Sequence, residues 1–169
     1  MKLWFYDRMV TLGAAFVRSF ERGIARASLI PTTPFLDKNQ FAWTRVLEES
    51  TPVFRRELEA LLPRRAELPN FQDISRDQRH LSQDDGWKTV FFYAYGLRAE
   101  GNCERCPETV RIVESIPGMK TAFFSILSPG KHIPLHRGPY RGVIRAHLGL
   151  IVPEPREKVR IQVGDEFAN

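Results

Sequence analysis

The sequence predicts an α+β protein in which a helical N-terminal flank precedes a mainly β core. Apolar side chains recur at steps of three and four in residues 5–20, which is the period of a helix. Residues 87–95 and 121–127 are instead rich in aromatic and β-branched side chains, as strands are. The chain has 169 residues, of which 43% are hydrophobic and 27% charged, which is typical of one globular domain with a sizeable core.

An amphipathic helix is the first predicted element, within residues 1–27. Its apolar stripe consists of Phe5, Met9, Leu12, Phe16 and Phe20. The stripe packs on the domain or lies on a membrane surface or a partner, and Arg18, Arg22 and Arg26 suit an anionic surface. The uncharged run 9–17 is too short to cross a bilayer, and we see no secretory signal. We expect a cytoplasmic protein, with peripheral contact at the inner membrane as the alternative.

Two more helices complete the N-terminal flank, which we place at residues 1–62. Asp37 follows a proline-containing connector and is placed to cap a helix that ends at Glu49. Pro52 breaks or restarts that pattern, and residues 53–62 again have helical spacing. Residues 63–86 are polar and irregular, which predicts a long loop.

The remaining residues, 87–169, form the predicted β core. A loop at 96–105 leads to a short helix that begins at Pro107 and ends at Pro117-Gly118. A long turn at 128–139 contains a Pro-Gly pair. Strands are predicted at residues 87–95, 121–127, 141–152 and 158–163.

The charge balance excludes one class of partner. The net charge is +5, and the isoelectric point is about 9.5. The basic residues are scattered among acids, however, and no nucleic-acid-binding motif is present. We therefore expect no nucleic-acid partner.

The two cysteines, Cys103 and Cys106, form a single Cys-x-x-Cys pair. A structural zinc site needs four ligands, and no second pair or nearby histidine completes one. A redox pair normally opens a helix after a strand, and the helix predicted at Pro107 leaves that alternative open. We expect two reduced thiols in a cytosolic protein.

Residues 125–150 contain three of the four histidines together with several arginines. His136 follows Pro134 in the predicted turn, which could aim its imidazole at a metal ion. On the strand that follows, Arg145 and His147 share one face and the apolar side chains share the other. An arginine fork beside a histidine suits a carboxylate ligand. The alternatives are an exposed loop histidine and a solvated strand face.

This constellation resembles the aspartyl/asparaginyl β-hydroxylase family of iron(II)- and 2-oxoglutarate-dependent dioxygenases. The resemblance covers about half of the chain, from about residue 85 to about residue 163. Bacterial lipid A acyl-chain hydroxylases share a similar pattern and are the nearest competing branch. The matching residues are Ser125, Pro129-Gly130, His132, Pro134, His136, Gly138-Pro139 and the sequence Arg-Ala-His-Leu-Gly-Leu at 145–150.

The resemblance implies a double-stranded β-helix (a cupin-like jelly roll) that binds Fe(II) and the cosubstrate 2-oxoglutarate. His136 would be the first iron ligand, and Arg145 and His147 would belong to the 2-oxoglutarate pocket. Ser125 would hydrogen-bond the cosubstrate, and Trp87 would line the same pocket. The substrate would be a peptide, a free amino acid or a lipid. A non-catalytic cupin-like module that binds a carboxylate is the alternative function.

Two departures from the family pattern affect these expectations. The usual non-haem iron motif has two histidines and one carboxylate, but Gly138 stands where the carboxylate would be. The β-hydroxylase branch resembles this chain in lacking that carboxylate, whereas the lipid A branch tends to carry Asp there. The family's second iron histidine and a second arginine lie beyond the long strand, and no histidine follows His147 here. We therefore expect a C-terminally incomplete jelly roll, with little or no hydroxylase activity from this chain alone.

Overall fold

The computed structural model describes residue 23 and residues 25–138 and 142–169. Nearly all of the amphipathic helix predicted at 1–27 lies outside these residues. Among the helices that the structure does describe, none is both long and apolar enough to cross a membrane.

The helices that precede the sheet begin and end close to the predicted positions. A 3₁₀ turn, Lys38–Gln40, is capped by Asp37, whose carboxylate accepts a hydrogen bond from the backbone N–H of Asn39 at 2.9 Å. Helix α2 (Ala42–Glu49) ends where the sequence predicted. Helix α3 (Thr51–Leu61) follows at once.

The stretch predicted as a loop, 63–86, is largely built from short helical turns. Each is too short to display a helical period in the sequence, which is why the pattern was missed. The stretch is joined to the sheet by a hydrogen bond of 3.0 Å from the backbone N–H of Thr89 to the carbonyl of Pro69. The turns are η2 (Leu62–Glu67), α4 (Phe71–Ile74) and η3 (Arg76–Leu81).

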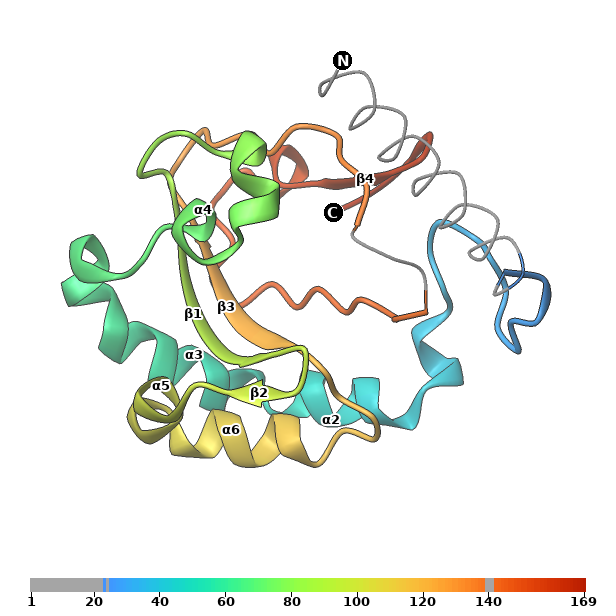
Figure 1. Cartoon of the computed structure of the whole chain (residues 1–169), viewed down its shortest axis with the longest axis horizontal. Coiled ribbons are helices and arrows are strands. Elements are labelled where there is room, and N and C mark those ends of the chain that lie inside the picture. Colours follow the sequence, from blue (N-terminus) through green and yellow to red (C-terminus); the bar gives the residue numbers. More distant parts are fainter. Residues whose placement is uncertain (1–22, 24, 139–141) are drawn as a thin grey trace, which may run out of the picture.

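A three-stranded antiparallel sheet occupies the centre of the molecule, in the order β2-β1-β3 (Figure 1). Strands β1 (Trp87–Ala94) and β3 (Ala122–Leu127) confirm the strands predicted at 87–95 and 121–127. The predicted loop at 96–105 instead contains the short strand β2 (Leu97–Arg98) and helix α5 (Glu100–Arg105).

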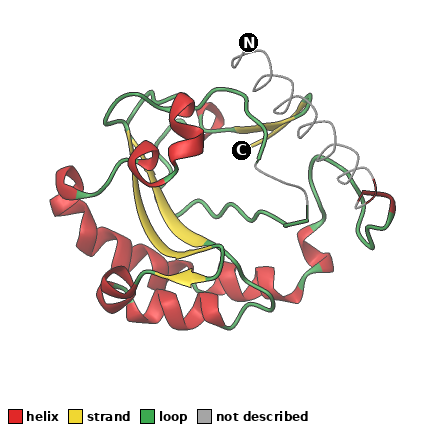
Figure 2. Cartoon of the chain, in the orientation of Figure 1, coloured by secondary structure: helices red, strands yellow, loops and turns green. Residues whose placement is uncertain are grey.

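One face of this sheet packs against helices. Helix α6 (Pro107–Glu114) begins at its proline as predicted and lies with α3 along the sheet (Figure 2). Phe92 is 1% exposed and meets Phe124 of the neighbouring strand edge-on, at 5.0 Å between ring centroids. The same buried cluster includes Phe54, Leu58, Leu61, Val90, Cys103, Cys106, Val110 and Val113.

The opposite face of the sheet carries two of the residues expected to bind a cosubstrate, Trp87 and Ser125. The strand register sets Thr89 opposite Ser125 and Phe91 opposite Phe123. The Phe91 and Phe123 rings stack at 4.4 Å between centroids. At the end of this face, helix α4 supplies a second stacked pair, Phe71 on Trp87 at 3.8 Å.

The strand predicted at 141–152 is not formed in the described part of the chain. Residues 142–152 run as an extended segment with no strand partner (Figure 1). The alternation of the sequence is nevertheless informative, because Leu148 and Leu150 both pack against the main core cluster. A strand is defined by the pairing of its backbone with a neighbouring strand, which is not formed here. Only the expected packing of alternate side chains is observed.

A separate two-stranded hairpin ends the chain. Strand β4 (Ile161–Val163) falls within the strand predicted at 158–163, but the residues before it form a 3₁₀ turn, Arg156–Lys158. Strand β5 (Glu166–Ala168) pairs with β4 and was not predicted. The described residues thus form two small antiparallel sheets, and the jelly roll stays a prediction.

Candidate functional site

The turn that carries His136 starts directly after β3 and is tied back to the sheet. The backbone N–H of Ser128 donates to the carbonyl of Gly86 at 2.8 Å. Gly130 has φ of +73°, a left-handed conformation that favours glycine, and the next residue, Lys131, donates its N–H to the Ser128 carbonyl at 3.0 Å. The first half of the turn therefore has a defined conformation.

His136 is oriented by its own turn. Its Nδ1 atom lies 2.9 Å from the carbonyl oxygen of Pro134. A carbonyl can only accept, so Nδ1 must carry the hydrogen, and the neutral ring then has its lone pair on Nε2. Many metal-binding histidines have their tautomer fixed by such a bond to a backbone carbonyl. The His136 imidazole is exposed, and its Nε2 is suited to a metal ion.

Arg145 lies against the same turn. A Cβ atom built on Gly138 would be 2.6 Å from Arg145 Nη2 and 3.1 Å from Arg145 Cζ. The guanidinium therefore occupies the space that a side chain at position 138 would need. No ion pair joins Arg145 to another described residue, so its donors are available to an anion.

His147 is two residues further along the extended segment. Desolvation by the surrounding protein lowers the pKa of His147, and the positive charge of Arg145 lowers it further, although the residue retains exposed surface. The neutral imidazole is thus favoured beside the guanidinium. A neutral ring adds a hydrogen-bonding group without adding a second charge.

Trp87 and Ser125 form the part of the site that lies on the sheet. The indole Nε1–H of Trp87, which is 5% exposed, donates to Ser125 Oγ at 2.9 Å. Because Ser125 accepts this bond and is exposed, its own O–H can donate to a ligand. Thr89 lies opposite Ser125, and its Oγ1 is buried without a hydrogen-bond partner among the described residues.

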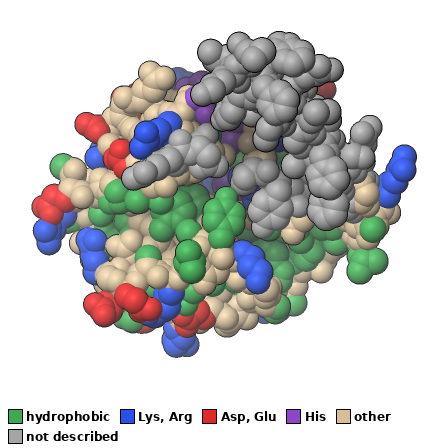
Figure 3. Space-filling model, in the orientation of Figure 1, with side chains coloured by type: hydrophobic (Ala, Val, Ile, Leu, Met, Phe, Trp, Pro, Cys, Tyr) green, Lys and Arg blue, Asp and Glu red, His purple; other side chains and the backbone are tan. Residues whose placement is uncertain are grey.

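Packing joins the turn to the sheet face. Ile133, in the middle of the turn, packs against the cluster formed by Phe71, Leu81 and Trp87. The segment that carries His136 therefore crosses the same face on which the indole of Trp87 reaches Ser125. In the space-filling view, histidine side chains are visible together in one region of the surface (Figure 3).

The described residues supply only part of a metal site. No group of three His, Cys, Asp or Glu side chains among them is arranged to hold a metal ion. His136 fits the role of a single ligand, and Arg145 fits the role of a carboxylate partner. Both fit the chemistry of a metal-dependent enzyme that uses an acidic cosubstrate, but further metal ligands would be needed.

The Cys-x-x-Cys pair has the properties of buried structural thiols. Cys103 and Cys106 are 1% and 0% exposed, and Cys103 Sγ lies 3.5 Å from the carbonyl of Phe92. Burial raises the pKa of both thiols, that of Cys106 to about 11. Both thiols therefore stay protonated at neutral pH, which argues against the redox alternative.

Sequence reasoning missed the polar residues that hold the turn. Arg65, from the predicted loop, donates to Ser128 Oγ at 2.7 Å, and Lys131 forms an ion pair with Asp84 at 2.8 Å. Neither pair has a spacing that signals contact, because the partners lie far apart in the chain.

Comparisons with known proteins agree with the resemblance noted in the sequence. The family model described as aspartyl/asparaginyl beta-hydroxylase matches residues 48–169. An ornithine lipid ester-linked acyl 2-hydroxylase of Rhizobium tropici is 50% identical over 136 residues, which is 80% of this chain and 48% of that protein. Human aspartate beta-hydroxylase domain-containing protein 2 is 31% identical over 140 residues, 77% of this chain and 36% of that protein.

The human aspartyl/asparaginyl beta-hydroxylase is a more distant relative, 30% identical over 89 residues, which is 50% of this chain and 12% of that protein. No solved structure matches significantly. The chain belongs to the aspartyl/asparaginyl β-hydroxylase family. It spans about half or less of the length of these relatives.

Proposed function

We propose that this chain contributes the cosubstrate-binding half of an iron(II)- and 2-oxoglutarate-dependent hydroxylase. The observation that carries the proposal is the contact between Arg145 and Gly138. It places the Arg145 guanidinium, which forms no ion pair with another described residue, against Gly138, two positions after His136, whose Nε2 is available. A cation for a carboxylate beside a ligand for a metal is the combination that this chemistry requires.

Each residue of the site has a distinct task in this proposal. His136 Nε2 would hold the ferrous ion, which supplies the oxygen activation when bound. Arg145 would bind a carboxylate of 2-oxoglutarate through two parallel hydrogen bonds, and the Ser125 hydroxyl would donate to the cosubstrate. Trp87 fixes the orientation of Ser125. His147 would add a neutral hydrogen-bonding group to the pocket.

Because His136 is the one imidazole assigned here to the metal, and no group of three possible ligands is arranged among the described residues, we propose that stable iron binding uses ligands beyond them. Affinity for iron rises with the number of well-placed ligands. Turnover by this chain alone is therefore expected to be low, although its residues can still bind the cosubstrate.

We propose the acyl chain of a membrane lipid as the substrate class. The relative that is 50% identical acts, by its name, on an ester-linked acyl chain of ornithine lipid. The sheet face beside Ser125 suits an aliphatic chain, since Phe123 and Leu127 are 38% and 45% exposed there. A peptide containing Asp or Asn is the second candidate, which the names of the human relatives and Gly138 favour.

Calorimetric titration of 2-oxoglutarate into the chain tests the cosubstrate assignment, with Mn²⁺ present as the metal probe. We expect Arg145→Gln to abolish binding and Arg55→Gln to leave it unchanged, since Arg55 pairs with Glu59 on an exposed helix face. Equal affinity in the two variants would refute the proposal. Carboxylate binding that is indifferent to metal would instead favour the non-catalytic binding module.

Co-sedimentation with vesicles tests the substrate class. Vesicles with and without ornithine lipid, matched in net charge, are compared for the chain and for Phe123→Asp. We expect ornithine lipid to increase sedimentation and Phe123→Asp to remove the increase. The matched control is Phe167→Asp, because Phe167 is 52% exposed but lies on the C-terminal hairpin. Binding of an Asp-containing peptide with no lipid dependence would move the assignment to the second candidate.

A further inference from the structure

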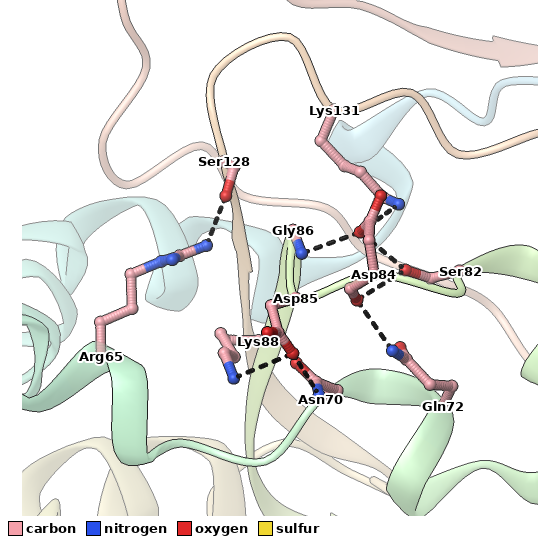
Figure 4. Close-up of polar contacts among 10 residues, drawn as sticks. All are labelled: Arg65, Asn70, Gln72, Ser82, Asp84, Asp85, Gly86, Lys88, Ser128 and Lys131. Atoms are coloured by element: carbon pink, nitrogen blue, oxygen red, sulfur yellow. Dashed lines mark hydrogen bonds and ion pairs between the residues drawn. The ribbon is translucent and has the colours of Figure 1, made fainter.

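Lys131 and Asp84 form an ion pair at the base of the turn that carries His136. Lys131 Nζ lies 2.8 Å from Asp84 Oδ1 (Figure 4). The Lys131 side chain is only 11% exposed, whereas that of Asp84 is 66% exposed. A lysine on a surface loop usually extends into water, so a nearly buried one indicates that its position is specified.

Asp84 is held in position by groups other than Lys131. Its Oδ1 accepts the backbone N–H of Gly86 at 2.8 Å and lies 3.4 Å from the Ser82 hydroxyl. Its backbone carbonyl accepts the side-chain amide of Gln72 at 2.8 Å. These bonds fix the carboxylate in space, and the Lys131 and Gly86 bonds lower its pKa, so it stays ionised.

Gly86 makes room for the lysine. A Cβ atom at position 86 would be 3.0 Å from Lys131 Cδ and 2.8 Å from Asp84 Oδ1. The aliphatic stem of Lys131 therefore lies directly over the backbone at Gly86. The carbonyl of the same glycine accepts the N–H of Ser128. Residues 84–86 thus hold the turn at two points, one through the backbone and one through a side chain.

We infer that the Lys131–Asp84 pair is a positioning device for the iron ligand His136, and this inference rests on the proposed function. The turn is anchored at Ser128 by backbone and by Arg65, at Lys131 by charge and at Ile133 by packing. Beyond these anchors, the bond between His136 Nδ1 and the carbonyl of Pro134 orients the imidazole. Loss of the Lys131–Asp84 pair would leave the His136 imidazole chemically unchanged but able to occupy a wider range of positions.

An ordinary surface ion pair would only add slightly to stability. A positioning pair predicts something more, which is that metal affinity at His136 changes while the fold does not. The measurement is the broadening of the His136 ring proton signals as Mn²⁺ is titrated into the whole chain. Amide hydrogen exchange of residues 131–136 without metal gives an independent reading of the turn.

We expect Lys131→Met, which keeps the stem over Gly86, to require about tenfold more Mn²⁺ for the same broadening. Lys131→Arg should restore the wild-type response, because it retains the charge. The matched control is Lys38→Met, which removes a pair of 2.6 Å with Glu48 in the N-terminal flank and should have no effect. Should Lys131→Met fail to fold, Asp84→Asn removes the same pair from the exposed side.

The outcomes separate this inference from the proposed function. If His136 responds selectively to Mn²⁺ and the variants respond as the wild type does, the positioning role is refuted while the metal assignment stands. If wild-type His136 responds no more than His80, the metal assignment fails and the positioning role fails with it. Slower or unchanged amide exchange at residues 131–136 in Lys131→Met would also contradict the inference.

Discussion

The guanidinium of Arg145 lies where the side chain of residue 138 would begin, and it can do so only because that residue is glycine. The distance from an ideal Cβ at Gly138 to Arg145 Nη2 is 2.6 Å, well inside van der Waals contact. A carboxylate side chain at position 138 would contact the Arg145 guanidinium. The glycine that departs from the usual iron motif therefore also leaves the arginine without an ionic partner among the residues that the structure describes.

The first prediction follows from this contact. Gly138→Asp should not create a better iron site but an ion pair with Arg145, which competes with the cosubstrate for the guanidinium. We expect the affinity for 2-oxoglutarate to fall by about tenfold, or about 1.4 kcal/mol, in calorimetry with Mn²⁺ present. Gly101→Asp adds the same charge where an added Cβ would meet nothing within 4 Å beyond its own helix, and it should change nothing. Tighter 2-oxoglutarate binding in Gly138→Asp would contradict the role given to Arg145.

The second prediction concerns the geometry of the cation rather than its charge. Arg145→Lys keeps one positive charge but loses the planar fork that binds a carboxylate through two bonds. We expect weaker 2-oxoglutarate binding than in the wild type, by about tenfold on the same scale. The variant Arg55→Lys serves as the control. Unchanged affinity in Arg145→Lys would show that the arginine acts only as a point charge or not at all.

The third prediction is a titration. The fold disfavours the imidazolium form of His147, so the pKa of His147 lies below the ordinary value for histidine. The free energy of unfolding therefore decreases as the pH falls from the ordinary histidine pKa toward the lowered one. Proton NMR of the histidine rings should show His147 titrating at lower pH than an unperturbed histidine. Arg145→Gln should raise its pKa by removing the nearby positive charge. No change in the pKa of His147 in that variant would mean that the Arg145 charge does not act on its imidazole.

A fourth prediction uses the buried hydroxyl of Thr89. Its Oγ1 lacks a partner among the described residues, and such a group is costly to bury. Thr89→Val keeps the shape of the side chain and should increase the free energy of unfolding, by up to about 1 kcal/mol, in urea denaturation. Thr109, whose hydroxyl is also buried and has no partner in the part of the chain that the structure describes, provides the comparison on a helix. A clear loss of stability in Thr89→Val would mean that an unseen partner satisfies the hydroxyl.

The fifth prediction concerns the thiols. With the pKa of Cys106 raised to about 11 and that of Cys103 also raised, neither forms appreciable thiolate at pH 8. Both should resist alkylation by iodoacetamide in the native chain and react after unfolding in urea. Stability should also decrease as pH rises from about 9 toward 11, because the unfolded thiols ionise first. Rapid alkylation of the native chain would reopen the redox interpretation.

The sequence predicted the elements whose signal is local. Pro107 marked the start of α6, and the aromatic runs marked β1 and β3, because propensity and packing agree there. The segment 141–152 was overestimated for a physical reason. Alternating side chains report which residues are buried, but they carry no information on whether a neighbouring strand is present to pair with the backbone.

Only part of the candidate site could be predicted from the sequence. The sequence identified His136, Arg145 and His147 as a group, but not the contact of Arg145 with Gly138, which needs the backbone of the turn. The ion pair between Asp84 and Lys131 joins residues far apart in the chain, and long-range polar pairs leave no periodic trace. Two glycines, 86 and 138, turned out to be places where another side chain crosses closely, which a glycine in a sequence cannot specify.

Leu148 and Leu150 secure the extended segment to the core although no described strand pairs with its backbone. Side chains on one side of the segment thus attach it to the core, while its backbone N–H and C=O groups pair with no described strand. A strand added beside this segment would meet backbone groups that pair with no described strand, next to Arg145 and His147. Assembly of this region would then add one strand beside a segment whose position side-chain packing has already set.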